Sequence, residues 1–417
     1  MIETNATAQT MMNGRATGEF DAPEISATAV TRLVLNGFRN YASLRLTIEA
    51  APVVLTGPNG AGKTNLIEAL SFLAPGRGLR GAKLTDVTRN GSESWAVAAT
   101  LSGGSGGFGL GYPVDVGTGL EAVAEQTDAD TDIAANPRRL VRIDGAPARS
   151  VNALADIAVV SWLTPQMDGL FIDGASGRRR FLDRLVYGFD TGHARRVAAY
   201  EKALRERSRL LRERRGDAAW LDALEDTVAG HGIAVAAARR DAVSRLSGAM
   251  ESGFGGAGSD SFPRARVSVS GTVEDWLAEL PAVEAEARFR ESLSASRALD
   301  ATTGGAQTGP HKSDLIVVHV AKAMPAALCS TGEQKALLIA IVMADARLQA
   351  ARLGRAPLLL LDEVAAHLDD VRRDALYAEI RALGAQAWLT GTDPGLFGAL
   401  ADVAQFMTVK DGTVQPD

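Results

Sequence analysis

Gly57-Pro58-Asn59-Gly60-Ala61-Gly62-Lys63-Thr64 is the stretch of this sequence that decides the fold. It matches G-x-x-x-x-G-K-[ST], the pattern of a phosphate-binding P-loop. Residues 52–56 before it (PVVLT) predict a short buried strand, and residues 65–70 after it (NLIEAL) have the apolar spacing of a helix. The alternative is a glycine-rich turn that contains Lys-Thr by chance, but such a turn would require neither the strand before it nor the helix after it. We therefore expect a nucleoside triphosphate site.

Each residue type in this stretch has a physical reason to be there. The glycines let the backbone turn tightly and present successive N–H groups to phosphate oxygens. The helix that follows adds the positive end of its dipole beneath the same anion. Lys63 is expected to reach the β- and γ-phosphates of ATP, and the Thr64 hydroxyl to ligate Mg²⁺.

Length and composition narrow the class of protein. The chain has 417 residues, 46% of them hydrophobic and 23% charged, which suits two or three domains or one large head with an insertion. The longest apolar run, 337–344, is far shorter than the roughly 20 residues of a membrane span. The single cysteine, Cys329, excludes an intramolecular disulfide and is expected to pack as a small buried residue, not to act as a nucleophile. We expect a cytoplasmic protein without a membrane partner.

The charge distribution is uneven although the net charge is only −6. Residues 178–215 contain 13 Lys/Arg and 5 Asp/Glu, an excess of 13 − 5 = +8, whereas residues 114–137 contain 6 Asp/Glu and no Lys/Arg. This asymmetry favours a polyanion-binding face, and a solvated helical surface is the alternative. The DNA-contact candidates are Arg178, Arg179, Arg180, Arg205, Arg209 and Arg212.

The pattern along the chain predicts an α/β head that is split by a helix-rich insertion. Residues 1–28 are polar, lack periodicity and predict a disordered leader. An N-terminal lobe is expected over 29–177, with one acidic, glycine-rich loop at about 102–137 between strands at 95–101 and 140–143. Helical spacing over 178–300 predicts the inserted subdomain, and strands and helices of a C-terminal lobe return over 301–417.

Two carboxylates follow an apolar strand in the C-terminal lobe. Leu358–Leu361 ends in Asp362 and Glu363, and a parallel strand delivers its last residues to the sheet edge where a P-loop also sits. Asp362 is then expected to hold Mg²⁺, and Glu363 to polarise the attacking water. A solvated turn is the alternative, and the P-loop elsewhere in the chain argues against it.

The segment Ser330-Thr-Gly-Glu-Gln-Lys335 precedes a strongly apolar helix. Serine before a helix is good N-terminal capping chemistry, and that alone could explain it. The functional interpretation is that these donors and the helix dipole are directed at a γ-phosphate.

Together these motifs resemble an ABC-type ATPase head of the SMC-like group, and more narrowly the RecF family of bacterial recombination mediators. The narrower resemblance rests on 35–41 (LNGFRNY), 60–66, 178–183 (RRRFLD), 308–314 (TGPHKSD) and 362–369 (DEVAAHLD). It covers roughly 31–412 and omits the leader and the acidic loop.

The resemblance implies further site residues. Arg39 and Asn40 are expected beside the phosphates, and Gln166 near Mg²⁺ and the attacking water as a Q-loop residue. It also implies that Ser330, Gly332 and Gln334 contact the γ-phosphate of a second copy of the chain, with Asp369 at that interface. Transporter ATPases usually have His where this chain has Thr392, so slow hydrolysis is expected. His311 is expected to have a structural or interdomain role.

The function implied is ATP-dependent DNA binding in recombinational repair and replication-fork maintenance. ATP would bridge a homodimer on duplex DNA or a single-strand/duplex junction, and slow, DNA-stimulated hydrolysis would release it. RecR and RecO are the partners that the resemblance implies. A transporter nucleotide-binding subunit, or a scaffold that loads repair proteins with incidental ATPase activity, are the alternatives.

Overall fold

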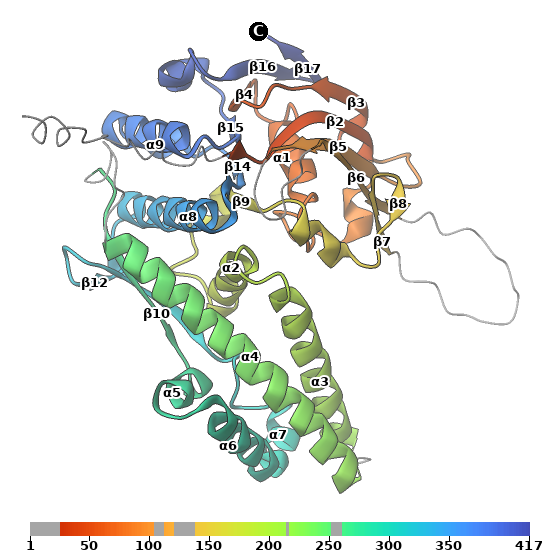
Figure 1. Ribbon diagram of the computed structural model, residues 1–417, viewed down its shortest axis with the longest axis vertical. Helices are drawn as coiled ribbons and strands as arrows, with labels where there is room; N and C mark the ends of the chain where they lie inside the picture. Colours follow the sequence, from red (N-terminus) through yellow and green to blue (C-terminus); the bar gives the residue numbers. More distant parts are fainter. Residues whose placement is uncertain (1–25, 104–111, 121–137, 214–216, 252–260) are drawn as a thin grey trace, which may run out of the picture.

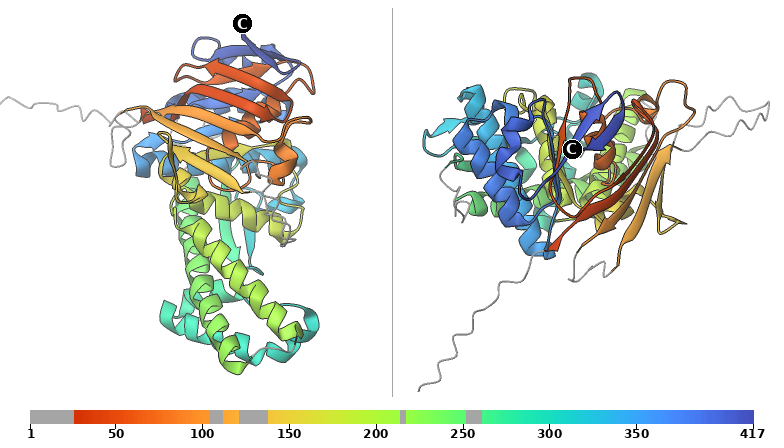
Figure 2. Two further views of the ribbon diagram at one scale, coloured as in Figure 1. Left: turned by 90° about the vertical axis from the view of Figure 1, so that its right-hand side faces the viewer. Right: turned by 90° about the horizontal axis from the view of Figure 1, so that it is seen from above.

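The computed structural model describes residues 26–103, 112–120, 138–213, 217–251 and 261–417. The chain forms a head of two six-stranded sheets and, beneath it, a helix-rich lobe (Figure 1; Figure 2, left). One sheet has the order β17-β16-β4-β15-β14-β9 and the other β3-β2-β5-β6-β7-β8. Helix α1 (Lys63–Ser71) contacts β14 and β15 and shares one apolar core with both sheets. The predicted α/β head is thereby confirmed.

The first sheet is parallel except at one edge. It contains β4 (Val53–Thr56), β9 (Val160–Leu163), β14 (Leu358–Leu361), β15 (Ala387–Thr390), β16 (Gln405–Lys410) and the antiparallel edge strand β17 (Thr413–Pro416). Both faces are covered, which explains the unbroken leucine run of β14. Leu358 and Leu360 pack on the α1 side, whereas Leu359 and Leu361 pack against α8 (Thr331–Leu353) and α9 (Asp370–Leu383).

The second sheet is antiparallel and corrects one expectation. It contains β2 (Ala29–Phe38), β3 (Tyr41–Thr47), β5 (Ala96–Ser102), β6 (Val114–Leu120), β7 (Arg139–Ile143) and β8 (Ala146–Pro147). The prediction of a single loop over 102–137 is wrong, because β6 pairs with both β5 and β7. Val114, Val116 and Thr118 are buried in alternation, and the intervening acid and glycines hid that pattern in the sequence. Residues 104–111 and 121–137 lie outside the described residues.

The inserted lobe is built on two long helices, α3 (His193–Glu213) and α4 (Ala218–Glu251). Around them lie α2 (Ala175–Tyr187), α5 (Thr272–Glu279), α6 (Ala282–Ala295) and α7 (Arg297–Thr303), as the lower half of Figure 1 shows. A three-stranded sheet joins β10 (Ala265–Ser270), β11 (Asp314–His319) and β12 (Met324–Pro325). Because β11 pairs with β10, the lobe continues beyond the boundary that the sequence placed at residue 300.

The start of the described chain is also ordered earlier than expected. Strand β1 (Ser26–Ala27) pairs in parallel with β13 (Arg355–Ala356), and the Thr28 amide donates to the Ala356 carbonyl at 3.1 Å. The prediction of a disordered leader over 1–28 is therefore wrong for residues 26–28, and residues 1–25 lie outside the described part. None of the helices in the described ranges combines the length and apolarity that crossing a membrane requires.

Candidate nucleotide site and basic surface

The P-loop connects β4 to α1 at the carboxyl edge of the parallel sheet. Gly57, Gly60 and Gly62 have φ values of 138°, 81° and 120°, a region that favours glycine. A Cβ at Gly57 would lie 2.2 Å from the Val409 carbonyl oxygen, so no other residue fits there. The Lys63 ammonium folds back and donates to the carbonyls of Gly57 at 2.7 Å and Pro58 at 3.0 Å.

Thr64 and Asp362, which the sequence separates by almost 300 residues, are in direct contact. The Thr64 hydroxyl donates to Asp362 Oδ1 at 3.0 Å. The Thr390 hydroxyl, at the end of β15, donates to the same oxygen at 2.8 Å and accepts the Glu363 amide at 2.9 Å. Glu363 has a positive φ of 53°, so its backbone is held in an unfavourable region at this turn. Thr390 was missed as a site residue, and only its place at the end of a strand beside β14 could have indicated it.

The electrostatics of this cluster suit a cation. Burial raises the pKa of Asp362, the nearby Glu363 charge raises it further, and hydrogen bonds from Thr390 and Thr64 oppose both effects. Burial lowers the pKa of Lys63, while the charges of Glu363 and Asp362 raise it. A hydroxyl and a buried carboxylate are the hard oxygen ligands that Mg²⁺ prefers, so Thr64 and Asp362 fit that ion.

Asn40 lies against the P-loop, whereas Arg39 is turned along α1. The Asn40 amide donates to the Ala61 carbonyl at 3.2 Å and its oxygen accepts from Asn65 at 2.8 Å. The Arg39 guanidinium pairs with both oxygens of buried Glu68, at 2.8 and 2.7 Å. In this structure Arg39 therefore braces the helix behind the loop, and a phosphate contact by either residue stays a prediction.

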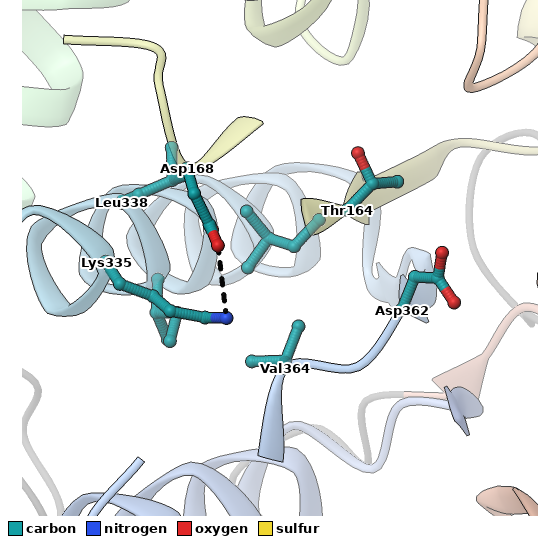
Figure 3. A pocket seen from close by; sticks show the side chains of 8 residues that line it. Thr164, Asp168, Lys335, Leu338, Asp362 and Val364 are labelled. Atoms are coloured by element: carbon teal, nitrogen blue, oxygen red, sulfur yellow. Dashed lines mark ion pairs between the residues drawn. The ribbon is translucent and has the colours of Figure 1, made fainter. Parts of the chain in front are cut away.

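Gln166 is exposed in a short 3₁₀ turn, Pro165–Met167, that follows β9. Just beyond it, Asp168 pairs with Lys335 of α8, with 3.6 Å between Oδ2 and Nζ (Figure 3). Beside this pair is a cavity with room for about one water molecule, lined by Leu163, Thr164, Asp168, Lys335, Leu338, Ile339, Asp362 and Val364. The metal-binding and catalytic roles predicted for Gln166 stay predictions.

Residues 330–335, which we call the signature turn, lie at the start of α8. Ser330 is its N-cap, and the Ser330 hydroxyl and amide both donate to Glu333 Oε2, at 2.9 and 3.1 Å. Gly332 is exposed, and a Cβ there would meet no atom within 4 Å. The Gln334 side chain is instead buried and donates to the Cys329 carbonyl at 2.8 Å, so a γ-phosphate contact would require it to turn outward.

The remaining predicted contact residues lie on the surface. Asp369 caps α9 by accepting the Arg372 amide at 2.9 Å, and its side chain is 57% exposed. Thr392 is exposed in the turn after β15. Cys329 is buried, as expected for a packing residue.

The basic residues of the inserted lobe divide into two sets. Helix α3 exposes a stripe of basic side chains at spacings of 7, 3, 4 and 3 residues, which places them on one face. We call this the α3 stripe: Arg195, Lys202, Arg205, Arg209 and Arg212. Arg205 and Arg209 also pair with neighbouring glutamates on the same helix, at 3.5 and 2.5 Å. The sequence missed Arg195 and Lys202, which only helical spacing could have grouped with the others.

Arg178 and Arg179 turn inward instead. Arg178 makes a bidentate contact with Asp314 at 2.7 and 2.8 Å, and Arg179 donates to the Ser313 carbonyl at 2.8 Å. These contacts join α2 to the start of β11 and the residue before it, so the two arginines are held by the lobe itself. Arg180 alone of the three is exposed.

Buried charged residues add further contacts between α2 and the rest of the inserted lobe. Asp183 accepts from Arg239 at 2.8 and 2.9 Å and contacts buried His193 at 2.8 Å. His311 contacts the Tyr200 hydroxyl at 2.6 Å and the Ala306 carbonyl at 2.9 Å, and burial lowers its pKa. These contacts fit the structural role expected for His311.

The head, the P-loop and the Thr64–Asp362 contact together define a P-loop nucleotide-binding head with an inserted helical lobe. The family model of the RecF/RecN/SMC N-terminal domain matches residues 29–415. The DNA replication and repair protein RecF of Mesorhizobium japonicum is 47% identical over 390 residues, which are 93% of this chain and 98% of that protein. That of Brucella suis biovar 1 is 49% identical over 385 residues, 92% and 95% of the two chains.

Solved structures agree on the fold. The recombination mediator protein RecF-ATP in the RecFOR pathway is 20% identical with a TM-score of 0.78, over 95% of this chain and 99% of that one. A Smc head domain from Pyrococcus furiosus is 16% identical with a TM-score of 0.52, over 94% and 96% of the two chains. This chain belongs to the RecF family.

Proposed function

We propose that this protein is an ATP-dependent DNA-binding ATPase of DNA replication and recombinational repair. The observation that carries the proposal is the contact between Thr64 and Asp362, because it brings a P-loop hydroxyl and the carboxylate after β14 to one point. Relatives at 47% identity named DNA replication and repair protein RecF support the biological context. The transporter alternative is not favoured by these relatives.

ATP and Mg²⁺ are the ligands proposed for this site. The phosphates would replace the Gly57 and Pro58 carbonyls as partners of Lys63, and Thr64 and Asp362 would hold the ion. Glu363 would orient the attacking water. Mg²⁺ would supply the positive charge that shields the phosphates from the buried carboxylate.

We propose further that ATP bridges two copies of the chain. Ser330 and exposed Gly332 begin α8, which packs on the opposite face of the parallel sheet from α1. A γ-phosphate bound at one P-loop would meet the signature turn of a second copy, with Asp369 beside it. ATP would then act as a timer, because hydrolysis removes the group that holds the dimer together.

The α3 stripe is the DNA surface that we propose. Exposed Lys and Arg side chains bind phosphates without reading bases, which suits duplex DNA and single-strand/duplex junctions. Arg180 joins this surface as an exposed candidate. The inward contacts of Arg178 and Arg179 assign them to holding the lobe, so the proposal does not rest on them.

The test measures duplex binding by fluorescence anisotropy against salt, with and without MgATP. We expect the affinity to fall steeply with salt and to require nucleotide. The double variant Arg205→Gln/Arg209→Gln should flatten the salt slope by about 2, since each lost phosphate contact lowers it by roughly 1. Arg290→Gln, at an exposed arginine of α6 that pairs with Asp226 of α4, is the matched control. DNA binding that is independent of salt and nucleotide would refute the proposal.

A second measurement addresses the bridge. Lys63→Ala should abolish ATP-dependent dimerisation in sedimentation velocity, and a variant that still dimerises on adding ATP would exclude the bridging role. Hydrolysis is expected to be slow and to be stimulated by DNA. RecR and RecO are the proposed protein partners, and co-purification with and without ATP tests them.

A further inference from the structure

The start of α8 and the turn that carries Gln166 meet at a single charged contact. Lys335 lies five residues after Ser330, and its side chain is only 9% exposed. Asp168, two residues after Gln166, is its one ion-pair partner within the described ranges, at 3.6 Å. Figure 3 shows the two side chains converging beside Leu338 and Val364.

This pair lies between two parts of the proposed nucleotide site, the P-loop and the signature turn. The cavity beside it is closed by the ends of β9 and β14, and Asp362 lies on its wall. The Asp362 amide donates to the Leu163 carbonyl at 2.9 Å, so these two strand ends are held together. Asp362 in turn contacts Thr64. An unbroken set of contacts therefore runs from the P-loop to the helix that begins with the signature turn.

Lys335 is the buried member of this pair, and Asp168 is its half-exposed partner, with 43% of its side chain accessible. A buried ammonium without a partner is costly, so Lys335 holds Asp168, and with it the 3₁₀ turn, against α8. The other groups that line the cavity are apolar except Thr164 and Asp362. No second cation among the lining residues could take over the role of Lys335.

We infer that the Lys335–Asp168 pair is a positioning link that holds the Gln166 turn and the signature turn of one chain in a fixed relative position. This rests on the proposed ATP-bridged dimer. Nucleotide bound at a chain's own P-loop then controls how that chain presents Ser330 and Gly332 to a second copy. Neither Lys335 nor Asp168 is assigned a contact with nucleotide, so both act through the residues that they hold.

The experiment compares Lys335→Met, Asp168→Asn and the double variant in the full chain. The dissociation constant of the MgATP-dependent dimer should rise about tenfold in each single variant. The dimer of the double variant should dissociate no more readily than that of the more affected single variant, because each substitution removes the same interaction. Binding of a fluorescent ATP analogue to dilute monomer should stay within about twofold of wild type. Arg245→Met and Asp241→Asn, from an exposed pair on α4, are the matched controls.

Wild-type dimer affinity in both single variants would overturn the inference, as would additive losses or an equal loss of monomer nucleotide binding. A wild-type chain that fails to bind ATP or to dimerise would instead refute the proposed function, and the inference with it. Amide hydrogen exchange without nucleotide gives an independent readout. Residues 165–170 should exchange faster in Lys335→Met than in wild type, and unchanged exchange would also overturn the link.

Discussion

Asp183→Asn is expected to destabilise the protein strongly, because Asp183 is the buried counter-charge of the joint between α2 and α4. It accepts two hydrogen bonds from Arg239, whose side chain is 5% exposed, and contacts His193, which is fully buried. The asparagine keeps the shape, so no cavity forms, but Arg239 loses its neutralising partner. Removing one member of a buried pair costs about 3–5 kcal/mol. Water screens this pair little, so we expect the full effect.

The pKa of Asp183 determines how the stability contributed by this interaction changes with pH. Burial raises the pKa of Asp183, but hydrogen bonds from His193 and Arg239 and the charge of Arg239 outweigh it, so the folded-state pKa lies below the ordinary value. The unfolded chain therefore takes up the proton first. The stabilisation is complete above the unfolded pKa of about 3.9 and is lost as the pH falls through the folded value. Asp183→Asn should lack this part of the acid dependence.

The assay is urea unfolding at pH 7, followed by circular dichroism. Asp241→Asn is the control, since the Asp241–Arg245 pair is exposed and such pairs contribute about 0–1 kcal/mol. Two results would refute the reasoning: an Asp183→Asn protein within about 1 kcal/mol of wild type, or an Asp241→Asn protein that loses as much.

Three further outcomes are expected. Thr390→Val removes the partner of the Glu363 amide and should slow single-turnover ATP hydrolysis about tenfold with nucleotide binding retained; unchanged hydrolysis would contradict this. Tyr200→Phe loses the hydrogen bond to His311 and should lower the unfolding free energy by about 1 kcal/mol in a urea titration, and no change would show that the bond contributes nothing net. Hydrogen bonds from Lys322 and Ser330 lower the pKa of Glu333 to about 2, so its carboxyl should remain ionised at pH 3 by NMR; a midpoint near 4.5 would disprove those contacts.

Signals that are local in the chain were read correctly from the sequence. The P-loop lies between β4 and α1 because its glycines, Lys63 and the flanking strand and helix are contiguous. The leucine run before Asp362 predicted a buried strand, and β14 is one, since a strand covered on both faces needs apolar residues at every position. Strand β6 was missed because its alternation is carried by only three inward residues among glycines and an acid.

The orientation of the charged residues could not be predicted from local sequence patterns. Composition indicated an excess of positive charge over 178–215 but could not separate Arg178, which faces Asp314, from Arg205, which faces solvent. The partner that turns Arg178 inward is 136 residues away, so no local pattern contains it.

By itself, the sequence predicted the nucleotide site and the family, because the P-loop and the motifs at 35–41, 178–183, 308–314 and 362–369 are each contiguous stretches. Only the tertiary structure decided which side chains act together. Thr64 meets Asp362, Thr390 supports Glu363, and Lys335 pairs with Asp168. Each of these contacts joins segments distant in the chain, and their geometry follows from strand order and helix packing, which no single segment encodes.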